Sequence, residues 1–97
     1  MDMESLMAQA ETLQKRIAEA QDSLAQMHVK GISQNGAVVV GMTGKYDIES
    51  VVINDSAMSL GAKAVSDLAL AAFKDAKEKA DALIEKVMNS VTDTDAE

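Results

Sequence analysis

The stretch from residue 3 to residue 27, MESLMAQAETLQKRIAEAQDSLAQM, carries an unbroken heptad pattern. Its apolar residues recur at alternating spacings of three and four: Met3, Leu6, Ala10, Leu13, Ile17, Ala20, Leu24 and Met27. This spacing places the apolar side chains on one stripe of an α-helix, as in the contact line of a coiled coil. Neither Gly nor Pro interrupts the stretch. We therefore predict one helix, roughly 37 Å long, that packs along another helix.

A second helical stretch, about residues 62–91, closes the chain. Near its start the apolar face is broad, and we expect that part to pack on a sheet: Val65, Leu68, Ala69, Ala72 and Phe73. Farther on, the face narrows to a seam in which the small side chains of Ala69, Ala76 and Ala80 would let the first helix approach closely. Ser56 or Ser59 is expected to cap this helical region. Residues 92–97 are predicted to form an acidic, flexible tail.

Between the two helical stretches the hydrophobic period becomes that of β-strands. Residues 28–32 alternate polar with small or apolar side chains, and Asn35-Gly36 is a strong hairpin signal. Residues 37–43 are rich in valine, which favours a central strand. Residues 45–47 can turn, and residues 48–53 form a third strand. The predicted fold is α+β: a long helix, a three-stranded antiparallel meander and a second long helix.

The predicted sheet has apolar side chains on both faces. Val51 and Ile53 share one face, and Val52 lies on the other. Val39 and Met42 are expected on the same face as Val52, so the second face would also be apolar. Such a face has to be covered by a helix or by a partner subunit.

The length of 97 residues predicts a single domain spanning residues 1–97. A domain of this size buries only roughly 60–65% of its unfolded surface, and long projecting helices would bury less. We therefore expect the chain to complete its core with a second copy, most simply in a twofold dimer.

The composition argues against several classes of function. The chain has no Cys and one His, so neither a disulfide framework nor a thiolate metal site is expected. Its apolar runs are too short to span a membrane, and the first residues lack a signal-peptide pattern. His28, Tyr46 and the scattered glycines form no catalytic, nucleotide-binding or metal-ligating pattern. The sequence predicts a non-enzymatic, cytoplasmic protein without cofactor, metal, small-molecule substrate or membrane partner.

The charge balance does not by itself demand a nucleic-acid partner, because the formal net charge is −7. Much of the negative charge lies at the two ends: Asp2, Glu4, Asp93, Asp95 and Glu97. The body of the chain is mixed in charge. Its helices carry six candidate phosphate-contacting residues: Lys15, Arg16, Lys74, Lys77, Lys79 and Lys86. Because acidic residues alternate with them, an ordinary solvated face of i,i+3 and i,i+4 ion pairs is the competing interpretation.

Four segments together resemble the YbaB/EbfC family of bacterial nucleoid-associated proteins. They are residues 65–76 (VSDLALAAFKDA), residues 6–10 leading into Leu13-Gln14-Lys15, residues 36–40 (GAVVV) and residues 51–54 (VVIN). The resemblance covers about residues 5–90. Two features depart from the family: Lys74 stands where Asn is frequent, and the ends are acidic rather than basic. Such acidic ends would repel phosphate.

The resemblance implies a helix–sheet–helix fold that dimerises through the sheet region, with paired helices projecting like tweezers. It implies binding to double-stranded DNA in the nucleoid with modest or variable sequence preference, a role in nucleoid organisation or the regulation of gene expression, and no catalysis. DNA contacts would come from the helical arms, and thus from the six basic residues. The expected dimer interface comprises Val38, Val40, Met42, Val51, Ile53 and Phe73.

A different class of function fits the same architecture. A prefoldin-like chaperone also has two coiled-coil helices joined by β-hairpins, and its arm ends would hold a client protein through residues such as Met3, Met7 and Val91. A plain adaptor that binds a protein through the uncovered sheet face is a further alternative.

Overall fold

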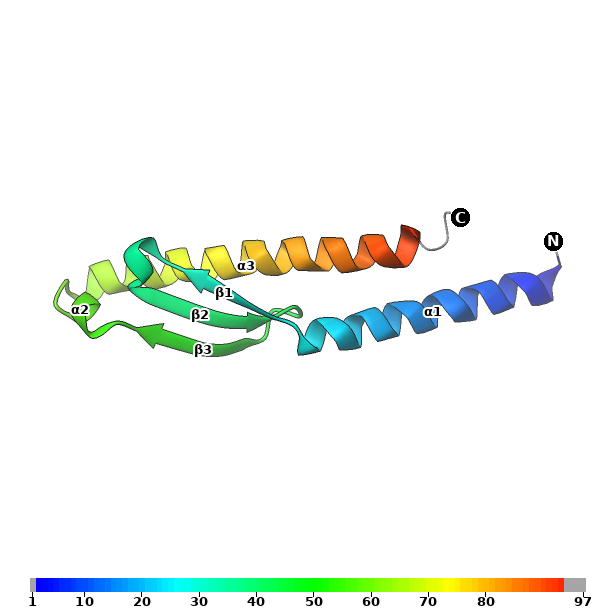
Figure 1. Cartoon of the computed structure of the whole chain (residues 1–97), viewed down its shortest axis with the longest axis horizontal. Helices are drawn as coiled ribbons and strands as arrows, with labels where there is room; N and C mark the ends of the chain where they lie inside the picture. Colours follow the sequence, from blue (N-terminus) through cyan, green and yellow to red (C-terminus); the bar gives the residue numbers. More distant parts are fainter. Residues whose placement is uncertain (1, 94–97) are drawn as a thin grey trace.

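The computed structural model describes residues 2–93, with side chains described to residue 91. The elements follow the predicted order: α1 (Met3–Gln26), β1 (His28–Ile32), a short 3-10 helix η1 (Gln34–Gly36), β2 (Val38–Thr43), β3 (Ile48–Ile53), α2 (Asp55–Met58) and α3 (Ala62–Asp93). The molecule is elongated, with extents of 68 × 19 × 16 Å. Figure 1 shows α1 and α3 projecting past the same end of the sheet as two arms. The predicted α+β fold is confirmed.

The arm helix α1 is only partly covered by the rest of the chain. Asp2 caps its start, because the Asp2 Oδ1 atom accepts a hydrogen bond from the Ser5 amide at 2.8 Å. Ala20 and Leu24, near the C-terminal end, are buried. The heptad stripe is open farther out, where Leu6 and Leu13 are 49% and 39% exposed. The predicted helix-to-helix seam is therefore filled within this chain only close to the sheet.

The sheet has the order β1-β2-β3, and both pairs are antiparallel. The β1–β2 hairpin turns at Asn35 and Gly36, whose φ angles are 63° and 69°. These left-handed angles suit Asn and Gly better than other residues, so the predicted hairpin is confirmed. The turn is a single 3-10 turn, closed by hydrogen bonds from the Gly36 and Ala37 amides.

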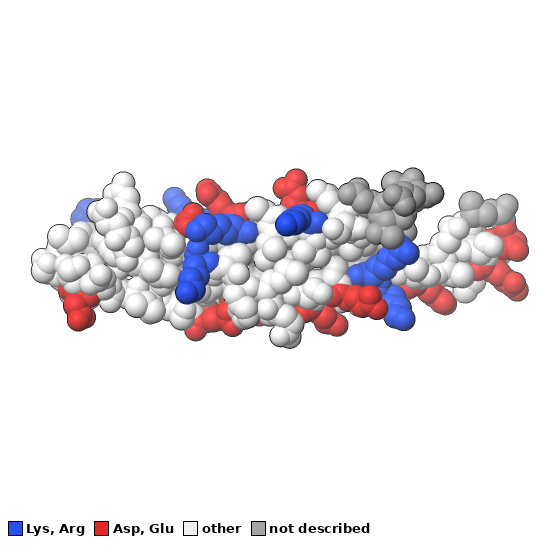
Figure 2. All heavy atoms as spheres, in the orientation of Figure 1, with Lys and Arg blue, Asp and Glu red and all other residues white. Residues whose placement is uncertain are grey.

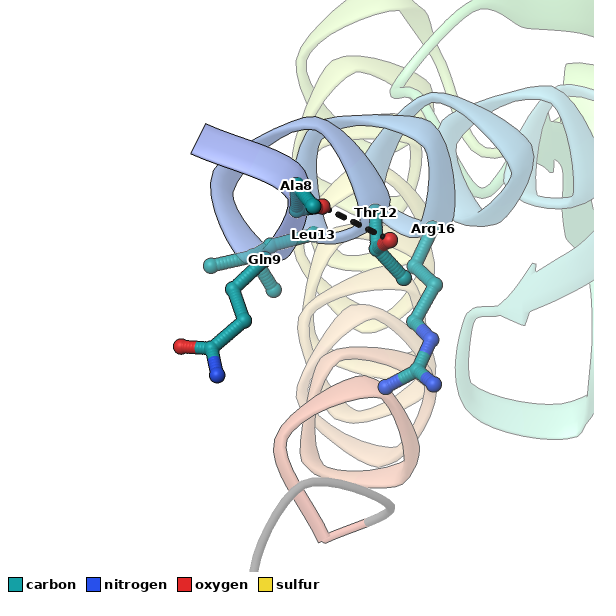
Figure 3. Close-up of a pocket in the computed structure, with 5 residues that line it drawn as sticks. All are labelled: Ala8, Gln9, Thr12, Leu13 and Arg16. Atoms are coloured by element: carbon teal, nitrogen blue, oxygen red, sulfur yellow. Dashed lines mark hydrogen bonds between the residues drawn. The ribbon is translucent and has the colours of Figure 1, made fainter. Parts of the chain in front are cut away.

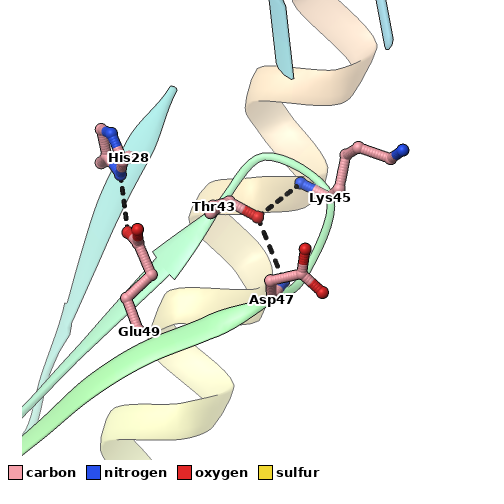
Figure 4. Close-up of polar contacts among 5 residues, drawn as sticks. All are labelled: His28, Thr43, Lys45, Asp47 and Glu49. Atoms are coloured by element: carbon pink, nitrogen blue, oxygen red, sulfur yellow. Dashed lines mark hydrogen bonds and ion pairs between the residues drawn. The ribbon is translucent and has the colours of Figure 1, made fainter. Parts of the chain in front are cut away.

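The β2–β3 turn is organised by the side chain of Thr43 (Figure 4). Its Oγ1 atom accepts hydrogen bonds from the amides of Lys45 at 3.2 Å and Asp47 at 3.1 Å. A second link spans the whole sheet, since His28 Nδ1 on β1 lies 2.6 Å from Glu49 Oε1 on β3. The predicted turn at residues 45–47 is confirmed.

The core lies between α3 and the strands β1 and β2. Val38 and Val40 are fully buried there with Met42, against three alanines of α3: Ala72, Ala76 and Ala80. Contact is close because Gly31 has no side chain. A Cβ atom on Gly31 would lie 2.0 Å from the Ala72 carbonyl oxygen and 2.6 Å from the Ala76 Cβ atom. The small residues of α3 thus accommodate the sheet, a role that the sequence analysis did not assign to Ala76 and Ala80 when it predicted that they admit α1.

Other local expectations also need correction. Met42 is 5% exposed and lies with Val40 on the face toward α3, because side chains alternate along β2 and residues 40 and 42 share a face. Asn54, rather than Ser56 or Ser59, is the cap: its Oδ1 atom accepts from the Ser56 amide at 3.1 Å and starts α2. Helix α3 continues to Asp93, so the predicted tail can begin only after it, at residues 94–97, which lie outside the described part.

Candidate nucleic-acid interface

The basic residues of α1 lie on the exposed part of the first arm. Lys15 is exposed, and Arg16 is half-buried. Arg16 borders a surface hollow of about 520 Å³ whose described lining residues all belong to α1: Ala8, Gln9, Thr12, Leu13 and Arg16 (Figure 3). The Thr12 hydroxyl is already used, since it donates to the Ala8 carbonyl at 2.9 Å. The described residues that line the hollow include no set of catalytic groups.

Arg16 also lines a second hollow, of about 330 Å³, where α1 and α3 come together. Glu19 and Ser23 of α1 face Val87 and Ser90 of α3 across it. Arg16 therefore stands where the two arm helices come together.

Two of the predicted α3 cations are held by the chain itself. The Lys77 Nζ atom lies 3.2 Å from Asp81 Oδ2 and 5.9 Å from the centre of the Tyr46 ring. The Lys79 Nζ atom lies 3.0 Å from Asp75 Oδ2 and donates to the Lys30 carbonyl at 2.7 Å. These are exposed i,i+4 pairs, which contribute little stability individually but lower the charge available to a ligand.

Both partner carboxylates are kept ionised. The Ile32 amide, and then Lys79, lower the pKa of Asp75. The Tyr46 hydroxyl, and then Lys77, lower the pKa of Asp81. Hydrogen bonds to a charged carboxylate favour that charged form. The competing interpretation of the basic residues as solvated ion pairs thus describes Lys77 and Lys79 well.

The other predicted lysines are more available. Lys15, Lys74 and Lys86 are exposed, and none of them makes an ion pair with another described residue. Figure 2 shows Lys and Arg atoms along the middle of the visible face, from the sheet region to the arms, with most acidic atoms toward its margins.

Lys30 of β1 belongs with these lysines, and the sequence analysis missed it. Its side chain is exposed, while its carbonyl oxygen accepts from Lys79, so the two residues are adjacent. Gly31 faces α3, and strand alternation therefore directs Lys30 to the opposite face of the sheet. The strand pattern of residues 28–32 already contained this signal.

The residues predicted for the dimer interface fall into two groups. Val38, Val40 and Met42 are buried in the core of a single chain, and Phe73 packs against that core. Val51 and Ile53, by contrast, are 45% and 38% exposed. They pair with Val40 and Val38 and so lie on the same face as α3, but α3 packs on β1 and β2 and leaves β3 uncovered. A second apolar row crosses the other face, in which Ile32 and Val52 are exposed and Val39 between them is half-buried.

Two further observations limit the chemistry of this part of the chain. Across residues 2–93, no group of three or more His, Asp or Glu side chains is arranged to hold a metal ion. No helix in the same range is long and apolar enough to cross a membrane.

Comparison with known proteins defines the class. Residues 1–95 match the model of the YbaB/EbfC DNA-binding family. A nucleoid-associated protein of Bradyrhizobium diazoefficiens is 41% identical over 92 residues, which are 94% of this chain and 87% of that protein. One from Francisella philomiragia is 44% identical over 78 residues, covering 80% and 70% of the two chains.

The fold is also found in a solved structure. The crystal structure of an uncharacterised protein from Helicobacter pylori superposes with a TM-score of 0.78 over 97% of each chain, at 19% identity. The family model and the two relatives place the chain in a class of DNA-binding proteins. The chain belongs to the YbaB/EbfC DNA-binding family, as its sequence resemblance predicts.

Proposed function

We propose that this protein is nucleoid-associated and binds duplex DNA as a homodimer, with its helical arms contacting the phosphate backbone. The exposed lysines of the two arms carry the proposal: Lys15, Lys74 and Lys86 have no ion pair with other described residues. Lysine neutralises phosphate charge and releases counterions, so its contribution does not depend on base sequence. Arg16 and Lys30 extend this surface toward the arm junction and the sheet.

The uncovered part of β3 supports the dimer. Val51 and Ile53 continue the apolar surface of the core beyond the edge of α3. A second copy that places its own β3 against this strand would bury both residues. Twofold pairing would also present two sets of arms, which doubles the number of cations that one DNA duplex can meet.

The experiment is the double charge reversal Lys15→Glu with Arg16→Glu, measured by fluorescence anisotropy on a labelled duplex. We expect DNA binding to be lost while the circular dichroism spectrum stays unchanged. The matched control, Lys45→Glu with Lys63→Glu, makes the same change in net charge at other exposed positions and should bind DNA far better. Equal affinities of the two variants would refute the arm surface.

The same pair of variants separates DNA binding from the prefoldin-like alternative. The open heptad stripe of α1, with Leu6 and Leu13 exposed, could hold a client protein, and charge reversal at Lys15 and Arg16 would leave that stripe intact. Suppression of client aggregation without any DNA binding by the wild type would favour the alternative. The family assignment favours DNA.

A further inference from the structure

The two edges of the sheet differ in how their backbone groups are used. At the β1 edge, the Ile32 amide donates to Asp75 Oδ2 at 2.8 Å, and the Lys30 carbonyl accepts from Lys79 Nζ at 2.7 Å. Asp75 and Lys79 also pair with each other at 3.0 Å. One carboxylate and one ammonium of α3 therefore occupy a donor and an acceptor that an added strand would need.

The β3 edge has no such cover. The Ser33 amide donates to the Val38 carbonyl at 3.0 Å, so Val38 points its backbone groups toward the β1 side. Because these directions alternate along an antiparallel strand, Val39 points toward β3, and its partner Val52 points back. Val51 and Ile53 consequently direct their amides and carbonyls outward, and no hydrogen bond from another described residue reaches those groups.

We propose that Asp75 and Lys79 close the β1 edge against strand addition, which leaves β3 as the sheet edge that a second copy of this chain extends. Open edges are templates for pairing with other chains, and proteins protect them with charged side chains or by covering them. Here the side chains of Asp75 and Lys79 also form hydrogen bonds with backbone groups of the β1 edge, in addition to placing charges beside it. The apolar side chains of Val51 and Ile53 make the remaining edge suitable for a β3 strand of the same sequence.

The inference rests on the dimer of the proposed function and explains why association would stop there. A dimer joined through β3 has a β1 edge at each end of its extended sheet. If both ends could pair, copies would add through β1 and β3 in turn and the sheet would grow without closing. With the Asp75–Lys79 pair in place, the assembly ends after one pairing.

The test is Asp75→Ala with Lys79→Ala, which removes both capping groups, keeps the net charge and retains a good helix former at each position. Light scattering after size exclusion should give an average mass of about double the wild-type value or more. The control, Lys63→Ala with Asp67→Ala, deletes another exposed i,i+4 pair of α3, with a 3.2 Å separation, that caps no strand. It should keep the wild-type mass.

Hydrogen exchange at the Ile32 amide provides a second reading. The exchange of this amide should be slow in the wild type and fast in the double variant just after dilution. It should become slow again once the double variant associates. A folded double variant of wild-type mass would overturn the inference, as would a variant that associates while its Ile32 amide stays fast. The mass of the variant is compared with the mass of the wild type, so this test does not depend on DNA binding. If the wild type failed to bind DNA, that would count against the proposed function, but the mass comparison would still test the capping of the β1 edge.

Discussion

The hydroxyl of Tyr46 donates a hydrogen bond to Oδ1 of Asp81, which joins the β2–β3 turn to the middle of α3. Lys77 completes the group, with its Nζ atom 3.2 Å from Asp81 Oδ2. Tyr46 adopts a φ of 69°, an unusual angle for a residue with a side chain. The contact thus holds a turn conformation that the local sequence alone does not favour.

This contact gives Tyr46 a measurable pH signature. The hydrogen bond to Asp81, followed by desolvation, raises the pKa of Tyr46, so the folded pKa should exceed the usual value of about 10. A raised pKa means that the contact stabilises the fold below the unfolded pKa and is lost as pH rises through the folded pKa. The chain has one Tyr and no Trp, so tyrosinate absorbance reports this residue alone. Asp81→Asn should bring its midpoint down, and Asp67→Asn should not; equal midpoints would show that the contact is absent.

Gly31→Ala should destabilise the protein strongly. The new Cβ atom would lie 2.0 Å from the Ala72 carbonyl oxygen and 2.4 Å from the Ala76 nitrogen, so α3 must move away from β1. We expect a loss of about 3 kcal/mol of unfolding free energy, at the upper end for overpacking. Gly36→Ala, where nothing lies within 4 Å but φ is +69°, should cost only about 1–2 kcal/mol. Urea unfolding of both variants measures these two losses. A larger loss for Gly36→Ala than for Gly31→Ala would mean that α3 does not lie so close to β1.

Val51→Lys should prevent the proposed dimer from forming without unfolding the chain. Val51 is 45% exposed on the α3 side of the sheet, over β3, which α3 does not cover. A charge there would be buried only when a second copy binds. The adjacent Val52, which is 60% exposed on the opposite face, supplies the control Val52→Lys. Sedimentation velocity at equal concentrations should separate the two variants. If the Val51→Lys variant formed a dimer as stable as that of the wild type, the dimer interface would not include the exposed side chains of Val51 and Ile53.

Single lysine changes should distinguish available charges from occupied ones. Lys86→Ala should reduce the slope of log affinity against log salt by about 1, the effect of one lost phosphate contact. Lys77→Ala should change the slope less, because Asp81 holds that ammonium group. The measurement is DNA affinity over a series of salt concentrations. A larger effect at Lys77 than at Lys86 would mean that DNA breaks the Lys77–Asp81 pair.

The periodicity of the sequence was sufficient to predict the elements and their order. The third strand was predicted at residues 48–53 and is found as Ile48–Ile53. The sequence could not specify whether α3 or a partner subunit covers each apolar face of the sheet. Val38, Val40 and Met42 were assigned to a partner subunit, yet α3 of the same chain covers them. The sequence pattern of an apolar strand face is the same whether a helix of the same chain or a partner subunit covers it. Only the tertiary structure distinguishes the two arrangements.

The roles of individual lysines depend in the same way on contacts between distant residues. The i,i+4 spacing of Asp75 and Lys79 is visible in the sequence, and their pairing could be anticipated. Their contacts to Ile32 and Lys30 join positions 43 and 49 residues apart. No local pattern predicts these contacts, because they require α3 to lie along the edge of β1.

Recognition of the DNA backbone is best tested by titrating a labelled duplex with the wild-type protein, followed by fluorescence anisotropy at low and at moderate salt. Light scattering of the same sample gives the oligomeric state. We predict a dimer whose affinity for the duplex falls steeply as the salt concentration increases, since each phosphate contact releases counterions. Absence of binding at low salt, or an affinity that does not depend on salt, would contradict recognition of the DNA backbone by the lysine-bearing arms.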